Sequence, residues 1–257
     1  MASSLDIAGS GWRAAEEDER PYLLYAVMSS VQPNGSAVAP DASMLQGVLG
    51  QPIFYIRSQN LDVAASLLND TSALMQPDTT EIVAYNSVVS ALHRHCDVLP
   101  LRYGSCSKGV AEAQELLSTH HAEYTAMLAM VAGCTEMSVS LLIDDQDQPL
   151  PAQSFSGSGT DYLKTRRLLQ KQQNERIARA RALGLQCRQV LAPWVVNDRE
   201  ELLPIDGVRS HSSNLVIHFL IHRQHVQAFR ITFRGLQQQS PIPMLLSGPW
   251  PPYNFTR

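Results

Sequence analysis

Apolar residues recur along the chain with two periods, and the strand-like runs are the clearest. Residues 22–28 form an unbroken apolar and aromatic run, and residues 53–56 form a second, shorter one. Such continuous runs are typical of strands that are buried on both faces. Residues 137–143 instead alternate apolar positions with Ser138 and Ser140, which predicts a strand with one wet face.

Spacings of three and four residues predict three helices. The first carries an apolar stripe made of Ile82, Tyr85, Val89, Leu92 and Cys96, which would lie on one face of a helix. The second runs over 110–131 and ends near Gly133. The third, longer helix is predicted over 161–183, with Thr160 as its N-cap and Gly184 as its end.

Two further segments read as strands. Residues 215–221 place four apolar side chains on one face, and residues 229–233 alternate Phe, Ile and Phe with polar residues. Because residues 223–225 are a short polar connection, we expect these two segments to form an antiparallel hairpin. Residues 98–104 should also be extended, and Pro100 restricts that strand to a sheet edge or a bulge because it lacks a backbone donor.

The mixture of strands, helices and a hairpin without regular βα units predicts an α+β fold. We divide the chain into four parts. Residues 1–20 are a flexible leader that contains an acidic run at 16–19. Residues 21–105 form an N-terminal α+β domain, residues 106–247 a C-terminal domain, and residues 248–257 a tail rich in proline and aromatic residues.

Composition is that of an ordinary soluble protein, with 257 residues, 44% of them hydrophobic and 17% charged. The formal net charge of −4 predicts no general attraction to nucleic acid or to anionic membranes. The polar, acidic start does not resemble a secretory signal, and no apolar run is long enough to cross a bilayer. The cytosol is therefore the expected compartment, where the four cysteines would be reduced thiols.

The predicted long helix has the most uneven charge in the chain. Residues 161–188 carry eight basic side chains against Asp161 and Glu175: Lys164, Arg166, Arg167, Lys171, Arg176, Arg179, Arg181 and Arg188. A solvated helix face is the plainer interpretation, and docking of an acidic or amphipathic partner is the alternative. Nucleic acid fits less well, because base-stacking aromatics are missing from the segment. We take Lys164, Arg166, Arg167 and Lys171 as candidate partner-binding residues.

The C-terminal tail is a second candidate surface. Its prolines hold the backbone extended and remove ladder hydrogen bonds, while Trp250, Tyr253 and Phe255 each offer a large apolar area. The tail could be pinned onto the protein's own body, which we favour because an exposed aromatic cluster promotes aggregation. It could instead be offered to another protein, since grooves recognise such segments.

Motifs for other chemistry are incomplete. The Gly157–Thr160 segment lacks the lysine of a P-loop and the third glycine of a dinucleotide fingerprint. His93 and Cys96 could share a ligand on one helix face, but two ligands do not make a zinc site. Cys106 has no accompanying protease signature. We therefore predict no catalytic, cofactor-binding or metal-binding residue.

Four segments together resemble the GvpL/GvpF family of gas vesicle proteins, and they occur in the family's order. Residues 22–27 are similar to its opening strand, and residues 98–104 to its Leu-Pro-Leu-Arg-aromatic-Gly signature, with Tyr103 where Phe is common. Residues 159–163 resemble the Gly-Thr-x-Tyr-Leu element that opens a basic helix. Residues 248–255 resemble the terminal Gly-Pro-Trp-Pro-Pro-Tyr-x-Phe.

The resemblance implies a two-domain α+β protein whose C-terminal domain is a modified ferredoxin-like fold with antiparallel strands. It implies an accessory protein of gas vesicle assembly that contacts the hydrophobic shell protein or early assemblies, with other vesicle proteins as further partners. A minor structural component of the shell is the alternative. The family implies no enzyme and no cofactor, and a cytoplasmic place at gas vesicles. A small enzyme with an unrecognised site is the third possibility.

Overall fold

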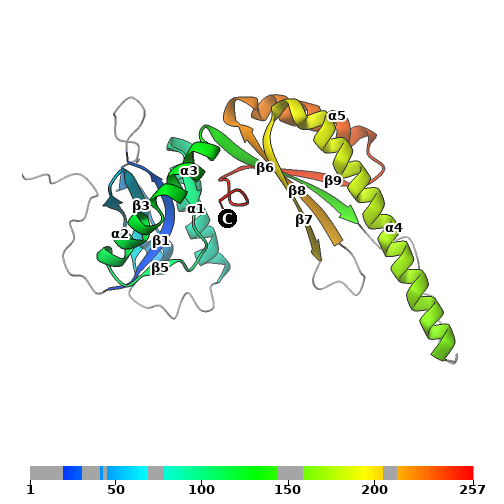
Figure 1. The fold of residues 1–257 in the computed structure, drawn as a ribbon, viewed down its shortest axis with the longest axis horizontal. Helices are drawn as coiled ribbons and strands as arrows, with labels where there is room; N and C mark the ends of the chain where they lie inside the picture. The colour runs from blue at the N-terminus through cyan, green and yellow to red at the C-terminus, as the bar shows by residue number, and fades with distance from the viewer. Residues whose placement is uncertain are drawn as a thin grey trace, which may run out of the picture. The chain divides into compact units, whose positions relative to one another are not determined.

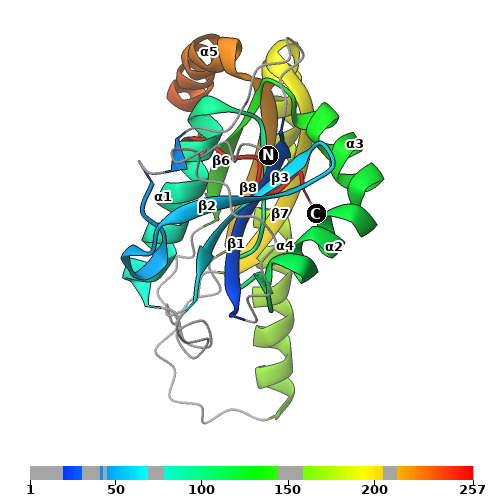
Figure 2. The same ribbon diagram turned by 90° about the vertical axis from the view of Figure 1, so that its left-hand side faces the viewer.

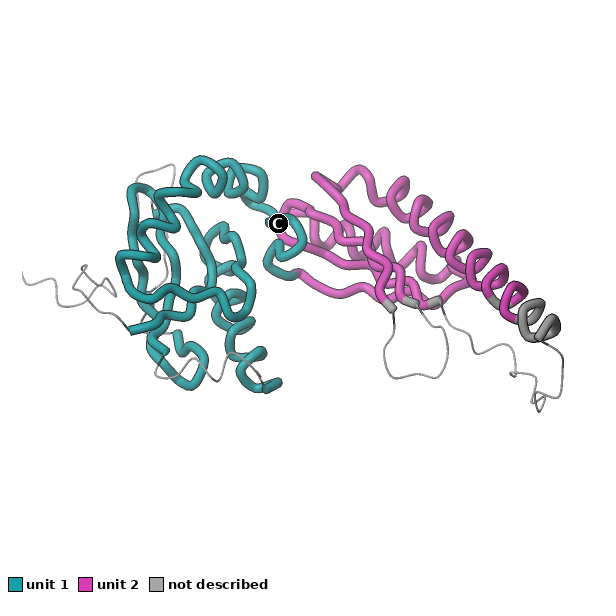
Figure 3. The backbone as a smooth tube through the Cα atoms, turned by 60° about the horizontal axis from the view of Figure 1, so that its bottom comes forward, with its two compact units in different colours: residues 1–134, 250–257 teal, residues 135–249 magenta. Residues whose placement is uncertain are grey.

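A computed structural model describes residues 20–30, 41–42, 45–68, 78–143, 159–204 and 213–256, without the side chains of residues 143, 159–165, 169, 204 and 213. The chain divides into two compact units, Met1–Cys134 with Trp250–Arg257, and Thr135–Pro249 (Figure 3). This division falls after Cys134, whereas the sequence places a boundary near 105. As domain assignments, the sequence-based ranges stay predictions, and the leader, apart from Arg20, lies outside the described residues.

The first unit contains an antiparallel sheet in the order β2-β3-β1-β4. The short strand β5 also pairs with β1. The strands are β1 (Tyr22–Ser29), β2 (Ile53–Ser58), β3 (Leu61–Leu67), β4 (Val98–Pro100) and β5 (Cys106–Ser107). Pro100 ends β4 at the edge of this path, as its missing donor predicts.

Helices lie on both faces of this sheet, with α1 (Thr79–His95) on one side and α2 (Val110–Thr119) and α3 (His121–Val131) on the other (Figure 2). Every side chain from Tyr22 to Met28 is therefore 0% exposed, which confirms the strand predicted as buried on both faces. The single helix predicted over 110–131 is wrong in one respect. His120, with φ −99° and ψ 17°, separates α2 from α3.

The helix α1 begins at a capping box, in which the Asp78 side chain accepts from the Glu81 amide and the Glu81 side chain accepts from the Asp78 amide. Its buried face contains Tyr85, Val89 and Leu92, as the predicted stripe requires. Ile82 is 40% exposed, so the first member of that stripe lies outside the core.

The second unit has the element order β6 (Cys134–Ile143), α4 (Gly159–Leu191), β7 (Val195–Pro204), β8 (Ser213–His222), α5 (Val226–Gln239) and β9 (Met244–Trp250). Its sheet has the order β7-β8-β6-β9, and β7 pairs antiparallel with β8. The two helices cover one face of the sheet (Figure 1). The core between them is built mainly from Met137, Val139, Leu141, Ala180, Cys187, Leu215, Ile217, Phe219, Phe229 and Phe233.

The hairpin predicted at 215–233 is wrong, because residues 226–239 form the helix α5. Phe229, Phe233 and Leu236 are all buried, and their spacing of four and three places them on one helix face. Ile231, which a strand would have placed beside the two phenylalanines, is 67% exposed. The predicted connection, Arg223–His225, is a 3-10 turn that leads into α5.

At two glycines an added Cβ would meet close neighbours. Gly184 lies inside α4, so the predicted helix end there is wrong, and a Cβ would come 3.0 Å from Ile217 Cδ1 of β8. Gly248 lies inside β9 at φ +109°, where a Cβ would come 2.7 Å from the Glu136 carbonyl oxygen. The first residues of the predicted tail are thus part of the sheet. No helix in the described ranges is long and apolar enough to span a membrane.

Candidate partner-binding surfaces

The helix α4 has two unlike halves, and its C-terminal half is the one packed on the sheet. Ala180, Cys187 and Leu191 are 0% exposed, and Ile177 and Leu183 pack against the same core. Their spacing gives the apolar stripe of an amphipathic helix. Burial also raises the pKa of the Cys187 thiol. This half of α4 is a structural element of the second unit.

Basic side chains in this packed half form ion pairs with β7. Arg188 Nε lies 2.5 Å from Asp198 Oδ2, and Arg188 Nη1 lies 2.8 Å from Glu200 Oε2. Arg181 Nε approaches Glu200 Oε1 at 3.3 Å. The paired carboxylates hold the pKa of Arg188 above its ordinary value, against the opposing effect of burial, which is the largest single contribution. These arginines thus bind the chain's own strand.

Three of the four predicted basic candidates lie in the N-terminal half. Arg166, Arg167 and Lys171 are exposed, as is the neighbouring Leu168 at 57%. Within the described residues, none of these three cations has an ion pair. The fourth candidate, Lys164, has its side chain outside the described part of the structure.

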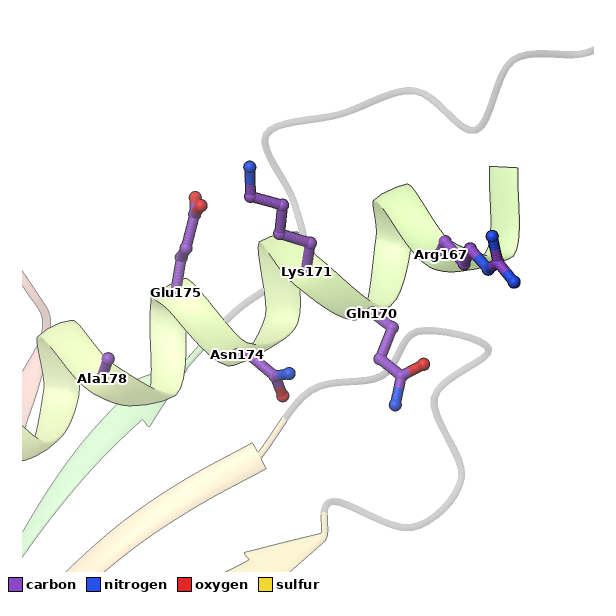
Figure 4. Close-up of a pocket in the computed structure, with 6 residues that line it drawn as sticks. All are labelled: Arg167, Gln170, Lys171, Asn174, Glu175 and Ala178. Carbon is purple, nitrogen blue, oxygen red and sulfur yellow. The ribbon is translucent and has the colours of Figure 1, made fainter. Parts of the chain in front are cut away.

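A shallow hollow of about 510 Å³ follows this half of the helix (Figure 4). The described residues that line it all come from α4: Arg167, Gln170, Lys171, Asn174, Glu175 and Ala178. Figure 4 shows Lys171 and Glu175, which are four residues apart, on the same side of the helix. The surface is therefore basic, polar and open, with an exposed leucine beside it.

The aromatic tail is held on the first unit. Phe255 is 1% exposed, and Pro251 and Pro252 are buried. The Tyr253 hydroxyl donates to Asn86 Oδ1 at 2.8 Å, and its ring packs against the core of this unit. This burial removes Phe255 from the residues that a partner can touch in this structure. Tyr253 is half-buried, and Trp250, at 47% exposure, is the most accessible of the three aromatics.

A second hollow, of about 550 Å³, lies between the tail and the segment after β4. The described residues that line it are Tyr85, Asn86, Pro100, Leu101, Arg102, Tyr103, Ser105, Tyr253 and Thr256. The Thr256 hydroxyl donates to the Pro100 carbonyl oxygen at 3.4 Å. Two segments that are distant in sequence, 98–104 and 250–256, thus meet around one hollow.

Tyr85 organises the wall of this hollow. Its hydroxyl lies 3.0 Å from the carbonyl oxygens of Leu24 and Leu101, and 3.1 and 3.2 Å from those of Tyr25 and Arg102. Its ring stacks on that of Tyr25, with centroids 4.8 Å apart. Burial raises the pKa of Tyr85 well above its ordinary value. The hydroxyl therefore stays a donor that links α1 to β1 and to the 98–104 segment.

Tyr103, at the rim, contacts Tyr85 edge to face, with ring centroids 5.3 Å apart. Its hydroxyl donates to Glu81 Oε2 at 3.3 Å. Desolvation, and then the charge of Glu81, raise the pKa of Tyr103 to about 12. The sequence pattern indicated the importance of this segment but not of Tyr85 or Asn86, because their roles arise from contacts with residues far along the chain.

A buried polar cluster on β6 and β8 has the residue types of a catalytic triad. Ser138 Oγ lies 2.9 Å from His218 Nδ1, and Glu136 Oε1 lies 3.2 Å from the same nitrogen. A triad holds its nucleophile and its acid on the two different ring nitrogens. Here Ser138 and Glu136 share one nitrogen, and the carboxylate that faces the other, Glu201 Oε2, lies 3.8 Å from Nε2, beyond hydrogen-bond distance, so the geometry is that of a hydrogen-bonded sheet cluster.

The family of the chain is decided by comparison with known proteins. A family model described as gas vesicle synthesis protein GvpL/GvpF matches residues 22–257. The chain belongs to the GvpL/GvpF family. Gas vesicle protein L1 of Halobacterium salinarum is 23% identical over 235 residues, which cover 81% of this chain and 82% of that protein.

Two crystal structures share the fold of this GvpL/GvpF protein. The gas vesicle protein GvpF of an Anabaena species has a TM-score of 0.69 at 17% identity, over 93% of this chain and 96% of the other. The GvpF of Microcystis aeruginosa also has a TM-score of 0.69, at 14% identity, over 92% and 99% of the two chains. The predicted α+β class of mixed helices and antiparallel strands is confirmed.

Proposed function

We propose that this GvpL/GvpF protein is an accessory protein of gas vesicle assembly that binds the hydrophobic shell protein or its early assemblies. Removing apolar surface from water lowers the free energy, so exposed apolar subunits tend to aggregate. A binding protein that covers them before they join the wall would prevent this. Other vesicle accessory proteins are further expected partners, with neither nucleic acid nor a membrane among them.

The observation that supports this proposal best is the open half of α4. Arg166, Arg167 and Lys171 lie on a helix whose other half is already committed to the sheet through Ala180 and the ion pairs of Arg188. A basic helix face with an exposed leucine suits an amphipathic segment that carries acidic side chains. Lys164 is a further candidate by its sequence position, and Trp250 is a candidate contact on the first unit.

We also propose that the second unit is a modified ferredoxin-like domain. Its element order, strand-helix-strand-strand-helix-strand, and its sheet order β7-β8-β6-β9 support this, because both match the split βαβ arrangement. The two compact units would then be two domains. We expect the protein in the cytoplasm, associated with gas vesicles, and acting without catalysis or a cofactor.

Capture of the shell protein tests the proposal. Purified chain is mixed with immobilised shell protein in the absence of vesicles, and the bound fraction is measured at low salt. The variant Arg166→Glu/Arg167→Glu/Lys171→Glu should lose most of the capture, since each change replaces an attractive charge by a repulsive one. A matched control, Arg94→Glu/Lys108→Glu/Arg179→Glu, alters the net charge equally at other exposed cations and should bind as the unaltered chain does.

Two outcomes would contradict the proposal. If the unaltered chain ignores the shell protein, shell binding is wrong. If both triple variants bind equally well, the α4 surface is wrong while shell binding stands. A chain that remains on purified vesicles through mild washing, and captures no soluble shell protein, would favour the alternative of a minor shell component.

A further inference from the structure

The last strand of the second unit has an edge that lies beside a helix. β9 ends the sheet order β7-β8-β6-β9, so one side of β9 faces no other described strand. A hollow of about 290 Å³ lies between this edge and α5. The described residues that line it are Arg230, Phe233, Arg234 and Gln237 of α5, and Leu245, Leu246 and Gly248 of β9.

The hydrogen bonds at β9 show which backbone groups face this hollow. The Pro243 carbonyl oxygen accepts from the Leu142 amide of β6 at 3.2 Å. Because successive residues of a strand point their backbone groups to opposite sides, residues 244, 246 and 248 face outward. Two of these carbonyls are held by α5 side chains, Met244 by Gln237 Nε2 at 2.7 Å and Gly248 by Arg230 Nη2 at 2.9 Å.

Between those two bonds lies Leu246, whose amide and carbonyl face outward by the same alternation. An outward donor and acceptor on a sheet edge is a template for another extended segment. Phe233, at 2% exposure, forms an apolar floor, and Leu245 on the strand is 66% exposed. Pro249 has no amide hydrogen, so pairing beyond Gly248 would lack a donor.

The charge of the hollow indicates what would fit. Arg230 and Arg234 are four residues apart on α5 and therefore lie on one face of the helix. No acidic side chain is among the described residues that line the hollow. Arg230 uses one of its five N–H donors on the Gly248 carbonyl, so its remaining donors can serve a carboxylate.

We propose that the β9–α5 groove binds an extended acidic segment of another protein by strand addition. Residues 244–248 of β9 would pair with that segment, and Arg230 and Arg234 would hold its carboxylates. A second copy of this chain fits less well. β9 carries no acidic residue, so an edge-to-edge dimer would bring the same arginines of both copies together. This inference is independent of shell binding by α4.

A model peptide tests the groove on the full chain. The probe is a capped octapeptide of alternating valine and glutamate, titrated while backbone amide NMR signals are followed. We expect a dissociation constant of roughly 1 mM or tighter, with shifts and slowed hydrogen exchange at the Leu246 and Gly248 amides. Arg234→Glu should weaken binding by at least about tenfold, whereas Arg94→Glu, the same change at an exposed position of α1, should leave it unaltered.

Two control peptides decide the mode of binding. The same peptide with lysine in place of glutamate should bind far more weakly, and one with alternate backbone nitrogens methylated should not bind, because it cannot donate to the strand. Equal binding of either control peptide, or no binding of the acidic probe at 1 mM by the criterion above, would overturn the proposal. So would a concentration-dependent dimer of this chain that Arg234→Glu abolishes and that blocks the probe.

Discussion

The tail and the first half of α4 are the two candidate surfaces in the sequence, and they differ in the structure. The tail places Phe255 at 1% exposure and ties Tyr253 to Asn86. The first half of α4 keeps Arg166, Arg167 and Lys171 exposed. Exposing an aromatic side chain to water is unfavourable, so such side chains become buried when their own domain offers a site. Cations are well solvated, and nothing comparable drives them to be covered.

The largest effect should come from emptying the site of Phe255. Phe255→Ala removes a buried ring and leaves a cavity, which costs about 3 kcal/mol. We expect the melting temperature of the first unit to fall on the order of 10 °C, measured by scanning calorimetry. Trp250→Ala, at the half-exposed end of the same segment, is the matched control and should cost clearly less. Equal decreases in melting temperature for the two variants would contradict the distinction between the buried Phe255 and the half-exposed Trp250.

A smaller change in the free energy of unfolding should distinguish the two halves of α4. Gly184→Leu forces a side chain against Ile217 and Leu215, and such overpacking costs roughly 1–3 kcal/mol. Gln170→Leu places the same side chain at an exposed position of the N-terminal half, and should be within about 0.5 kcal/mol of the unaltered chain. Urea unfolding of both variants measures the difference. If Gln170→Leu were the more costly of the two, the first half of α4 would be covered after all.

Ion pairs give a third comparison. Arg188→Ala removes the bonds to Asp198 and Glu200, and the side chain is 26% exposed, so a loss of about 1 kcal/mol is expected. Arg167→Ala should change the free energy of unfolding by less than about 0.5 kcal/mol. Added salt should shrink the Arg188 effect partially. A stability loss at Arg167 as large as that at Arg188 would contradict the assignment of the open half.

The smallest effect near neutral pH concerns the tyrosines beside the tail. The pKa of Tyr85 is raised by burial, and that of Tyr103 to about 12, against about 10 in the unfolded chain. A raised pKa means that the folded state holds the proton more tightly. The resulting stability is therefore complete below pH ~10 and is lost as the pH rises toward 12. Melting at pH 8 and pH 11 should show this loss, and Tyr103→Phe should show less of it.

Elements with one unambiguous period could be predicted from the sequence. β1, β6 and α1 form where their apolar patterns predict them, although the face of β6 that is expected to be solvent-exposed is buried at Ser138, which is 7% exposed. α5 could not be assigned, because Phe229, Ile231 and Phe233 fit a period of two as well as the helical spacing of Phe229, Phe233 and Leu236. Only the helix buries Phe229, Phe233 and Leu236 together while it exposes Ile231. Aromatic and β-branched residues favour strands on propensity, and packing overrides that preference here.

Other features depended on partners that a single segment does not reveal. β7 has a polar sequence, and it forms a strand at the sheet edge whose Asp198 and Glu200 bind arginines of α4. Gly184 suggests a helix end in the sequence, but it lies within α4. Its missing side chain leaves room for Ile217 of β8, which passes close to the helix at this position.

For the candidate sites, the sequence indicated the basic helix and the aromatic tail. It could not show that Phe255 is covered or that Arg188 is paired, since both facts depend on tertiary contacts.

The way the chain enters and leaves the second unit also determines the order in which the protein can be completed during synthesis. Residues 250–257 belong to the first unit, but a ribosome makes them only after all of the second unit. The site that Phe255 occupies must therefore stay empty while more than a hundred intervening residues, 135–249, are being translated. A nascent chain halted inside the second unit would leave that apolar site exposed, so the first unit can be completed only after the second unit has been made.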